Sequence, residues 1–196
     1  MNKKRNSEIQ RISHLLDGRS VVMLGMMGSG KSAIGKMAAR SLGLAFRDAD
    51  TEIENAAGRS VADIFAEYGE PEFRRLETRV IERLLNDGPV LIALGGGAYM
   101  AEETRQVVSE KALSIWLKAD INVLLERVSR RPGKRPLLKT GNPREILLDL
   151  LAKREPIYAL AELHIQSQKG SKADMRDFVL KTMHDHLSHQ MKATGS

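Results

Sequence analysis

The chain has 196 residues, of which 42% are hydrophobic and 29% are charged, and this length and mixture predict one globular domain with a sizeable core. It has no cysteine, which excludes disulfides and thiolate metal sites, and its apolar runs are too short to cross a bilayer. The net charge of +6 lies mostly in the two ends, because residues 20–164 hold 21 basic and 20 acidic side chains.

This distribution of charge bears on the partners that the protein could have. A basic surplus confined to the ends, with only eight aromatic residues to stack on bases, argues against nucleic-acid binding as the main role. The basic N-terminus is followed by no apolar segment typical of a secretory signal. We therefore expect a cytoplasmic protein, without a membrane or nucleic-acid partner, that acts as a monomer.

Residues 1–19 are predicted to form a short docking helix. Ile9, Ile12, Leu15 and Leu16 recur at roughly helical spacing, and Asp17-Gly18 follows as a stop signal. We interpret this segment as an N-terminal extension that packs on the domain rather than as part of a site.

Residues 20–36, SVVMLGMMGSGKSAIGK, contain the strongest motif of the chain. An apolar strand pattern leads into G-x-x-x-x-G-K-S at residues 25–32, and a helix pattern continues to Gly43. Glycines let the backbone N–H groups of such a loop turn inward around a polyphosphate, at the positive end of a helix. Lys31 is expected to reach the β- and γ-phosphates, and the Ser32 hydroxyl is expected to bind Mg²⁺. The alternative is an ordinary glycine turn before a helix.

Residues 44–86 are predicted to form a strand and three helices. The strand covers residues 44–48, and a helix over 51–57 ends at Gly58. Ser60 and Asp63 have capping-box spacing and open a helix through residue 68. Pro71 suits the first position of another helix, which continues to about residue 86.

The second half repeats the alternation of strands and helices. Strands are predicted at 90–94, 113–117 and 163–165; helices are predicted at about 101–111, after Asp120, from Asn142-Pro143 to about residue 154, and after Ser171. Residues 127–144 differ from the rest, since they hold seven basic side chains, no acidic ones and three prolines. We expect this segment to be exposed and mobile. The alternation predicts an α/β fold, with a parallel sheet covered on both faces.

Asp48 and Asp50 stand two positions apart at the end of a predicted strand. In an extended backbone both carboxylates would point the same way, so that one could hold Mg²⁺ through water and the other could accept a proton from an attacking hydroxyl. The alternative is that Asp50 only caps the next helix.

Other candidate groups fall at the same edge of the predicted sheet. Gly95–Gly97 follows a buried strand; it is either a plain loop or backbone that approaches a small ligand closely. Arg74 and Arg75 are about 100° apart on one helix, so only one of them should face the crevice. Arg135, in the basic segment, is a candidate lid residue that would close on the phosphates.

Taken together, several motifs resemble the shikimate kinase family. They are GMMGSGKS at 25–32, DAD at 48–50, GRSVADIFAEYGEPEFRRLE at 58–77, LGGGA at 94–98, RPLL at 135–138 and KREPIY at 153–158. Their order and spacing match over roughly residues 20–165. The resemblance implies a three-layer P-loop kinase fold with a five-stranded parallel sheet, helices for substrate binding at about 49–76 and a lid at about 129–142, followed by a C-terminal helix and tail at 166–196.

The resemblance also implies the reaction, namely transfer of the γ-phosphoryl of ATP to the 3-hydroxyl of shikimate. In that family pattern Asp50 would activate the hydroxyl, with Lys31 and Arg135 as the other catalytic residues. ATP would contact Gly28, Ser29, Gly30, Lys31, Ser32, Ala33 and Arg135. Shikimate would contact Asp50, Arg74, Gly96, Gly97 and Arg154, and Mg²⁺ would lie near Ser32 and Asp48. Glu77 would orient Arg74.

Some questions stay open at this point. The family usually has an adenine-contacting arginine shortly before RPLL, and Arg127, Arg130 and Arg131 compete for that role. A kinase for another small polyol such as gluconate, or for a nucleotide, would share the loop and the lid. A nucleotide-dependent switch would share the loop alone.

Overall fold

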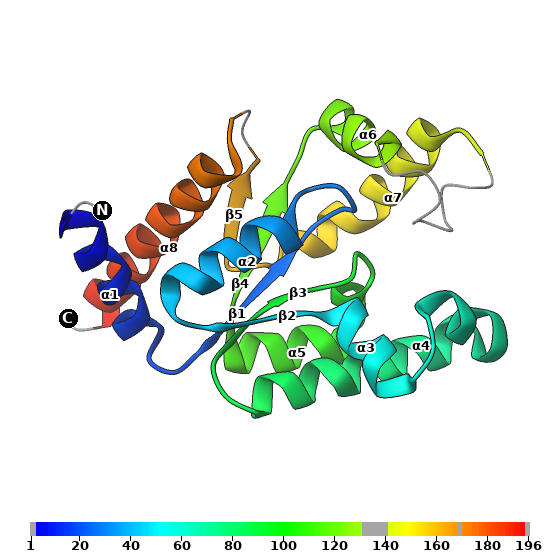
Figure 1. The fold of residues 1–196 in the computed structure, drawn as a ribbon, viewed down its shortest axis with the longest axis horizontal. Coiled ribbons are helices and arrows are strands. Elements are labelled where there is room, and N and C mark those ends of the chain that lie inside the picture. Colours follow the sequence, from blue (N-terminus) through cyan, green and yellow to red (C-terminus); the bar gives the residue numbers. More distant parts are fainter. Residues whose placement is uncertain (1–2, 131–140, 168–169, 195–196) are drawn as a thin grey trace.

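The computed structural model describes residues 3–130, 141–167 and 170–194, and within them it contains one five-stranded sheet (Figure 1). The strands are β1 (Ser20–Leu24), β2 (Ala45–Asp48), β3 (Val90–Ala93), β4 (Ala112–Lys118) and β5 (Leu163–Gln166). They are ordered β2-β3-β1-β4-β5, and every neighbouring pair is parallel. All carboxyl ends therefore lie at one edge. The predicted α/β fold with a five-stranded parallel sheet is confirmed.

Burial along the strands follows their position in the sheet. All residues of the central strands β1 and β3 are buried, whereas the edge strand β5 alternates between buried and exposed positions. Successive residues of β1 point to opposite faces, so that Val21 and Met23 enter one hydrophobic cluster while Val22 and Leu24 enter another. The sheet thus separates two cores.

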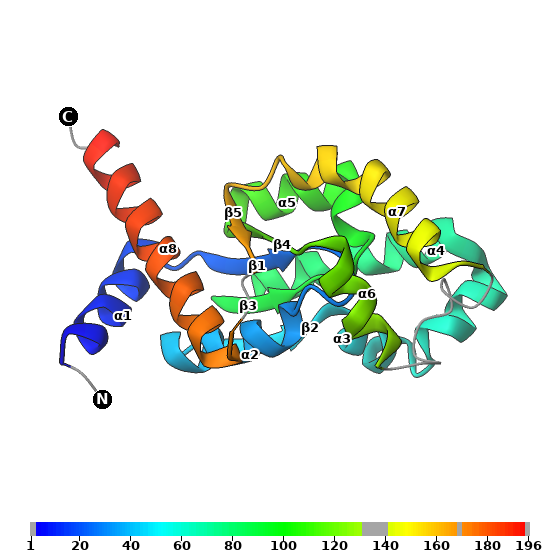
Figure 2. The ribbon, with the colours of Figure 1, turned by 90° about the horizontal axis from the view of Figure 1, so that it is seen from above.

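Helices cover both faces of the sheet (Figures 1 and 2). One core is closed by α1 (Lys3–Leu16), α2 (Lys31–Leu42) and α8 (Lys172–Thr194). The other is closed by α3 (Ala49–Ala57), α4 (Val61–Asn86), α5 (Glu102–Lys111), α6 (Ile121–Ser129), α7 (Pro143–Tyr158) and the short 3₁₀ turn η1 (Ala98–Met100). As the predicted docking helix, α1 packs against α8 and buries Ile12 and Leu16.

Helix boundaries confirm most of the capping signals. Gly43 and Gly58 end α2 and α3 with φ of 71° and 64°, values that favour glycine because it lacks a Cβ. The Ser60 side chain accepts a hydrogen bond from the Asp63 N–H at the start of α4. Gly69, with φ 78° and ψ 174°, interrupts α4 two residues before Pro71, so the two predicted helices meet at a kink.

Two local predictions were wrong. The helix expected to end at about Arg154 continues through Pro156 to Tyr158. Proline loses one backbone hydrogen bond there, but Tyr158 is buried in the core and holds the last turn in place. The premise of an extended backbone at Asp50 was also wrong, because β2 ends at Asp48 and Asp50 lies in the first turn of α3.

Of the predicted lid at about 129–142, residues 131–140 lie outside the described part of the chain. No helix within the described ranges is both long and apolar enough to span a bilayer.

Candidate functional site

The glycine loop after β1 forms the first part of the site. Gly25, Gly28 and Gly30 have φ of 142°, 84° and 107°, a left-handed range that other residues rarely adopt. Gly25 also lacks room for a side chain, because a Cβ there would lie 2.6 Å from the carbonyl oxygen of Leu117. The loop ends where Gly30 caps α2, so the positive end of a helix lies directly after the loop. The predicted strand, glycine loop and helix are all present.

Lys31 lies in the first turn of α2 and is buried beneath this loop. Its ammonium group donates hydrogen bonds to the carbonyl oxygens of Gly25, at 2.9 Å, and Met26, at 3.1 Å. The nearby Ser29 hydroxyl oxygen is buried without a hydrogen-bond partner among the described residues. A buried polar atom without a partner is costly, and a phosphate oxygen in the loop would be a suitable partner.

Ser32 and Asp48 come together beside the loop. The Ser32 hydroxyl donates to Asp48 Oδ2 at 2.6 Å, although 16 residues separate them in the sequence. Asp48 occupies the cap position of α3 but makes no capping bond with its side chain, so its oxygens face Ser32 instead. These are oxygen ligands of the kind that Mg²⁺ prefers, and no cluster of three histidine or carboxylate side chains suited to a metal forms in the described ranges.

Asp50, in the first turn of α3, faces Gly95. A Cβ at Gly95 would lie 2.6 Å from Asp50 Oδ1 and 2.9 Å from Glu77 Oε1, so only glycine lets this turn pass the two carboxylates. Desolvation raises the pKa of Asp50, Asp48 raises it further, and Lys31 opposes both. Asp50 does not occupy the cap position of α3, which belongs to Asp48, so the alternative of a mere helix cap was wrong.

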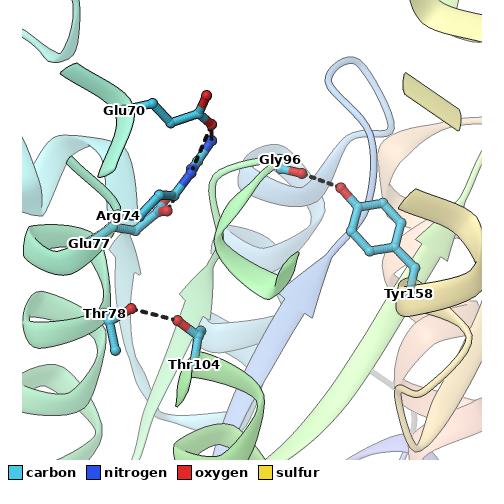
Figure 3. Close-up of polar contacts among 7 residues, drawn as sticks. All are labelled: Glu70, Arg74, Glu77, Thr78, Gly96, Thr104 and Tyr158. Atoms are coloured by element: carbon cyan, nitrogen blue, oxygen red, sulfur yellow. Dashed lines mark hydrogen bonds and ion pairs between the residues drawn. The ribbon is translucent and has the colours of Figure 1, made fainter. Parts of the chain in front are cut away.

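Arg74 comes from α4 and lies against Gly97 on the other side of the turn. Figure 3 shows it beside Glu70 and Glu77. Its Nη1 donates to Glu77 Oε2 at 2.6 Å, and its Nη2 donates to Glu70 Oε1 at 2.9 Å. Burial lowers the pKa of Arg74, but the two carboxylates outweigh burial and raise it above the usual value. The guanidinium is therefore always charged and is held in one orientation.

Glu77 supports Arg74 from inside the protein. Its side chain is only 2% exposed, and its Oε1 has no hydrogen-bond partner among the described residues. Burial raises the pKa of Glu77 to about 6, although Arg74 acts in the opposite direction. By contrast Arg75 is 72% exposed and pairs with Glu72, which confirms that only one of the two adjacent arginines faces the site.

Arg154 approaches the same turn from α7. It is buried, and a Cβ at Gly96 would lie 2.9 Å from its Nη1. In the described part of the chain no carboxylate forms an ion pair with Arg154, and its Nη1 lies 4.0 Å from Met26 Sδ. A buried guanidinium without an ion-paired carboxylate is unfavourable, and an anionic ligand would compensate its charge.

The structure thus collects Asp50, Arg74 and Arg154 around Gly95–Gly97, each against a different glycine. Side chains from three helices fill the space that Cβ atoms of this segment would take, so the glycines are required here, and close approach to a ligand stays a prediction. Sequence reasoning missed two contributors: Glu70, which pairs with Arg74, and Tyr158, whose hydroxyl donates to the Gly96 carbonyl oxygen. The spacing of Tyr158 four residues after Arg154 was an available signal.

Of the three arginines that competed for the adenine contact, Arg127 lies against the glycine loop. Its Nη1 donates to the carbonyl oxygens of Gly28, at 3.2 Å, and Ser29, at 3.1 Å. Arg130 is exposed and pairs with Glu126. Arg131 and Arg135 lie outside the described residues.

Comparisons with known proteins agree with this arrangement. The family model described as shikimate kinase matches residues 27–184. A shikimate kinase of Brucella canis is 47% identical over 196 residues, covering 99% of this chain and 98% of its own. The chain belongs to the shikimate kinase family. The match reaches beyond residues 20–165, the limits set from the motifs, into both terminal helices.

Solved structures of the shikimate kinase family share the fold. One from Acinetobacter baumannii, in complex with shikimate, superposes with a TM-score of 0.80 at 32% identity, covering 86% of this chain and 95% of the other. Another from Aquifex aeolicus has a TM-score of 0.72 at 30% identity, covering 84% and 95%. Family membership makes this chain a small-molecule kinase.

Proposed function

We propose that this kinase transfers the γ-phosphoryl of ATP to the 3-hydroxyl of shikimate, giving shikimate 3-phosphate and ADP. The observation that carries the proposal is the convergence of Arg74, Arg154 and Asp50 on Gly95–Gly97. The two arginines can bind the carboxylate of a small ligand, and Asp50 can bind its hydroxyl. The glycine turn leaves room for the ligand beside the backbone. The shikimate complex of the Acinetobacter baumannii relative supports this choice of substrate.

Shikimate recognition follows from the charges at this turn. Arg74 and Arg154 would bind the substrate carboxylate, since a guanidinium can offer two parallel N–H donors to one carboxylate. Gly96 and Gly97 would contact the ring through their backbone, which the lack of Cβ atoms permits. Glu77 would keep Arg74 oriented, in line with their 2.6 Å contact.

The nucleotide would occupy the glycine loop. Residues 28–33 would surround the β- and γ-phosphates with backbone N–H groups, and the Lys31 ammonium would turn from loop carbonyls to phosphate oxygens. Arg127, which already contacts the loop, would serve on the adenine side. Arg135 would close over the phosphates from the lid.

Mg²⁺ fits beside the loop, where the Ser32 hydroxyl and the Asp48 carboxylate would hold it directly or through water. When bound, it would neutralise phosphate charge and orient the terminal phosphoryl group. Both side chains present oxygen atoms, and their separation of 2.6 Å supports the proposal that they serve one ion together.

The reaction would proceed by in-line transfer. Asp50 would accept the proton of the shikimate 3-hydroxyl while the hydroxyl oxygen forms a bond to the γ-phosphorus of ATP. The bond from that phosphorus to the bridging oxygen would break at the same time, and ADP would leave with the electron pair. A raised pKa suits Asp50 to this role, because it makes the carboxylate a better proton acceptor. Lys31 and Arg135 would stabilise the charge on the transferring group.

A coupled ADP assay tests the proposal against its alternatives. The purified enzyme is given ATP, Mg²⁺ and, in turn, shikimate, quinate, gluconate and nucleoside monophosphates. We expect ADP release that depends on shikimate. Preference for gluconate or a nucleotide would identify another kinase, and slow hydrolysis indifferent to every acceptor would identify a nucleotide-dependent switch; either result refutes the proposal.

We also propose that the enzyme works as a cytoplasmic monomer. The absence of cysteine from the sequence supports a reducing compartment. Light scattering coupled to gel filtration measures the mass in solution, and a stable dimer would contradict the second half of this proposal. Fractionation of cells tests the first half.

A further inference from the structure

Tyr158 joins the last turn of α7 to the glycine turn. Its side chain is almost completely buried, and its ring packs edge-on against Trp116 of β4, with centroids 5.8 Å apart. The hydroxyl donates a hydrogen bond to the carbonyl oxygen of Gly96 (Figure 3). Burial raises the pKa of Tyr158, with Arg154 opposing, so the hydroxyl keeps its proton and remains a donor.

Arg154 completes a short chain of contacts. It lies one helical turn before Tyr158, close enough for its charge to lower the pKa of the same hydroxyl, and it packs against Gly96. Because a guanidinium carries only donors, Arg154 does not compete for the phenol proton, which the hydroxyl donates to Gly96. Tyr158 thus connects a proposed substrate-binding side chain to a proposed substrate-binding peptide.

The peptide between Gly96 and Gly97 needs such a restraint. Glycine restricts its backbone less than any other residue, and three glycines in a row leave this turn free to rotate its peptide planes. In a trans peptide the C=O and N–H groups point in opposite directions. Holding the Gly96 carbonyl toward α7 therefore directs the Gly97 N–H away from α7.

The Gly97 N–H has no intramolecular use among the described residues. Neither it nor the Gly96 N–H donates a hydrogen bond to another described group. A backbone donor that is oriented but unused is available to a ligand.

We propose that Tyr158 is a positioning residue for the acceptor substrate: its hydroxyl orients the Gly96–Gly97 peptide and the Arg154 guanidinium toward the carboxylated alcohol, without touching that substrate. This inference rests on the proposed function. It assigns the hydroxyl to acceptor binding, because the peptide that the hydroxyl contacts belongs to the glycine turn after β3 and not to the glycine loop after β1.

The test is Tyr158→Phe, which removes one oxygen atom and keeps the ring on Trp116. We expect the KM for shikimate to rise about tenfold, as for one lost hydrogen bond beside a charged group, and the KM for ATP to stay within about twofold. Tyr99→Phe is the matched control. Tyr99 is also buried, but its hydroxyl lies near Ser114 of β4, so its removal should leave both constants unchanged.

A second measurement separates positioning from a general loss of structure. Shikimate affinity is determined by titration calorimetry for Tyr158→Phe, Arg154→Lys and the double variant, with thermal melting recorded for each. We expect the double variant to lose less affinity than the product of the two single losses, because both changes break the same chain of contacts. Full additivity would overturn the proposal, even if both single variants bind poorly.

Other outcomes are equally decisive. An unchanged KM for shikimate in Tyr158→Phe overturns the positioning role, and so does an equal rise for ATP and shikimate accompanied by a lower melting temperature. If the wild-type enzyme itself releases no ADP in response to shikimate, the proposed function has failed instead. The wild-type ADP assay therefore distinguishes a failure of the proposed function from a failure of the positioning role of Tyr158.

Discussion

Replacing Gly97 by alanine would introduce one methyl group into the space that the Arg74 guanidinium occupies. A Cβ at this position would lie 2.6 Å from Arg74 Cζ, whereas ordinary contact starts at 3.4 Å, so the guanidinium must retreat by about 1 Å. The backbone itself tolerates alanine, because the φ of Gly97 is −108°. The perturbation is therefore confined to the arginine and to whatever that arginine binds.

The expected loss follows from the contacts of Arg74. A retreat of that size breaks the 2.6 Å contact with Glu77 and moves both donors away from the substrate carboxylate. A displacement of about 1 Å in a positioning group can reduce efficiency about a hundredfold. We expect the KM for shikimate in Gly97→Ala to rise by about 10- to 100-fold in the coupled ADP assay, with the KM for ATP within about twofold.

Gly43→Ala is the control for a loss of stability alone. Gly43 has a φ of 71°, and no atom lies within 4 Å of a Cβ built there, so alanine costs about 1 kcal/mol of backbone strain without disturbing the site. Its KM values should equal those of the wild type. An unaltered KM for shikimate in Gly97→Ala would refute the idea that the glycine turn exists to admit Arg74.

Three further predictions concern the carboxylates and the arginine of the site. Asp50→Asn should retain ATP affinity by calorimetry but lose most of kcat, because the amide cannot accept the hydroxyl proton; wild-type turnover would disprove the assigned role. Arg74→Lys should weaken shikimate binding at least tenfold, since an ammonium cannot keep the fork of donors that now meets Glu77 and Glu70, and unaltered shikimate affinity would count against the carboxylate site. Glu77 has its pKa raised from 4.5 to about 6, so the fold loses stability as the pH rises through 6 and this buried acid ionises. Relative to the wild type, Glu77→Gln should gain about 2 kcal/mol of unfolding free energy between pH 4.5 and 7 in urea titrations. A difference that does not vary with pH would show that Glu77 is not the titrating group.

The fold could be predicted from the sequence because local signals and burial agree there. The apolar runs that became β1 and β3 are continuous, as strands buried on both faces require, and the glycines that end α2 and α3 occupy left-handed conformations. A glycine placed after a helical pattern therefore predicts the end of that helix with few competing conformations. Family motifs then ordered these elements into the five-stranded sheet.

Local geometry at Asp50 could not be predicted in the same way. A spacing of two predicts a shared direction only if the backbone is extended, and the sequence does not show that α3 begins directly after Asp48. Arg74 and Asp50 nevertheless meet the same turn, because tertiary packing of α3 and α4 brings them there.

Contacts between distant residues were the other gap. The hydrogen bond from Tyr158 to Gly96 depends on α7 continuing past Pro156. Glu70 and Arg74, by contrast, are four residues apart, a spacing from which their pairing could have been predicted. Helix signals at Pro156 predict an earlier end, and only the buried environment of Tyr158 overrides them. The outcome at such positions depends on tertiary packing, which cannot be deduced from a single sequence.

The placement of α1 and α8 has a practical consequence for experiments on this molecule. Both terminal helices pack together at one end, while α3 and α4 lie at the opposite end (Figures 1 and 2). An affinity tag or a biotin attached through either helix would anchor the enzyme to a sensor chip with its working edge turned toward the bulk solution. Immobilised ligand-binding measurements could thus be made from either end of the chain, and agreement between the two attachment points would show that attachment does not disturb the readout.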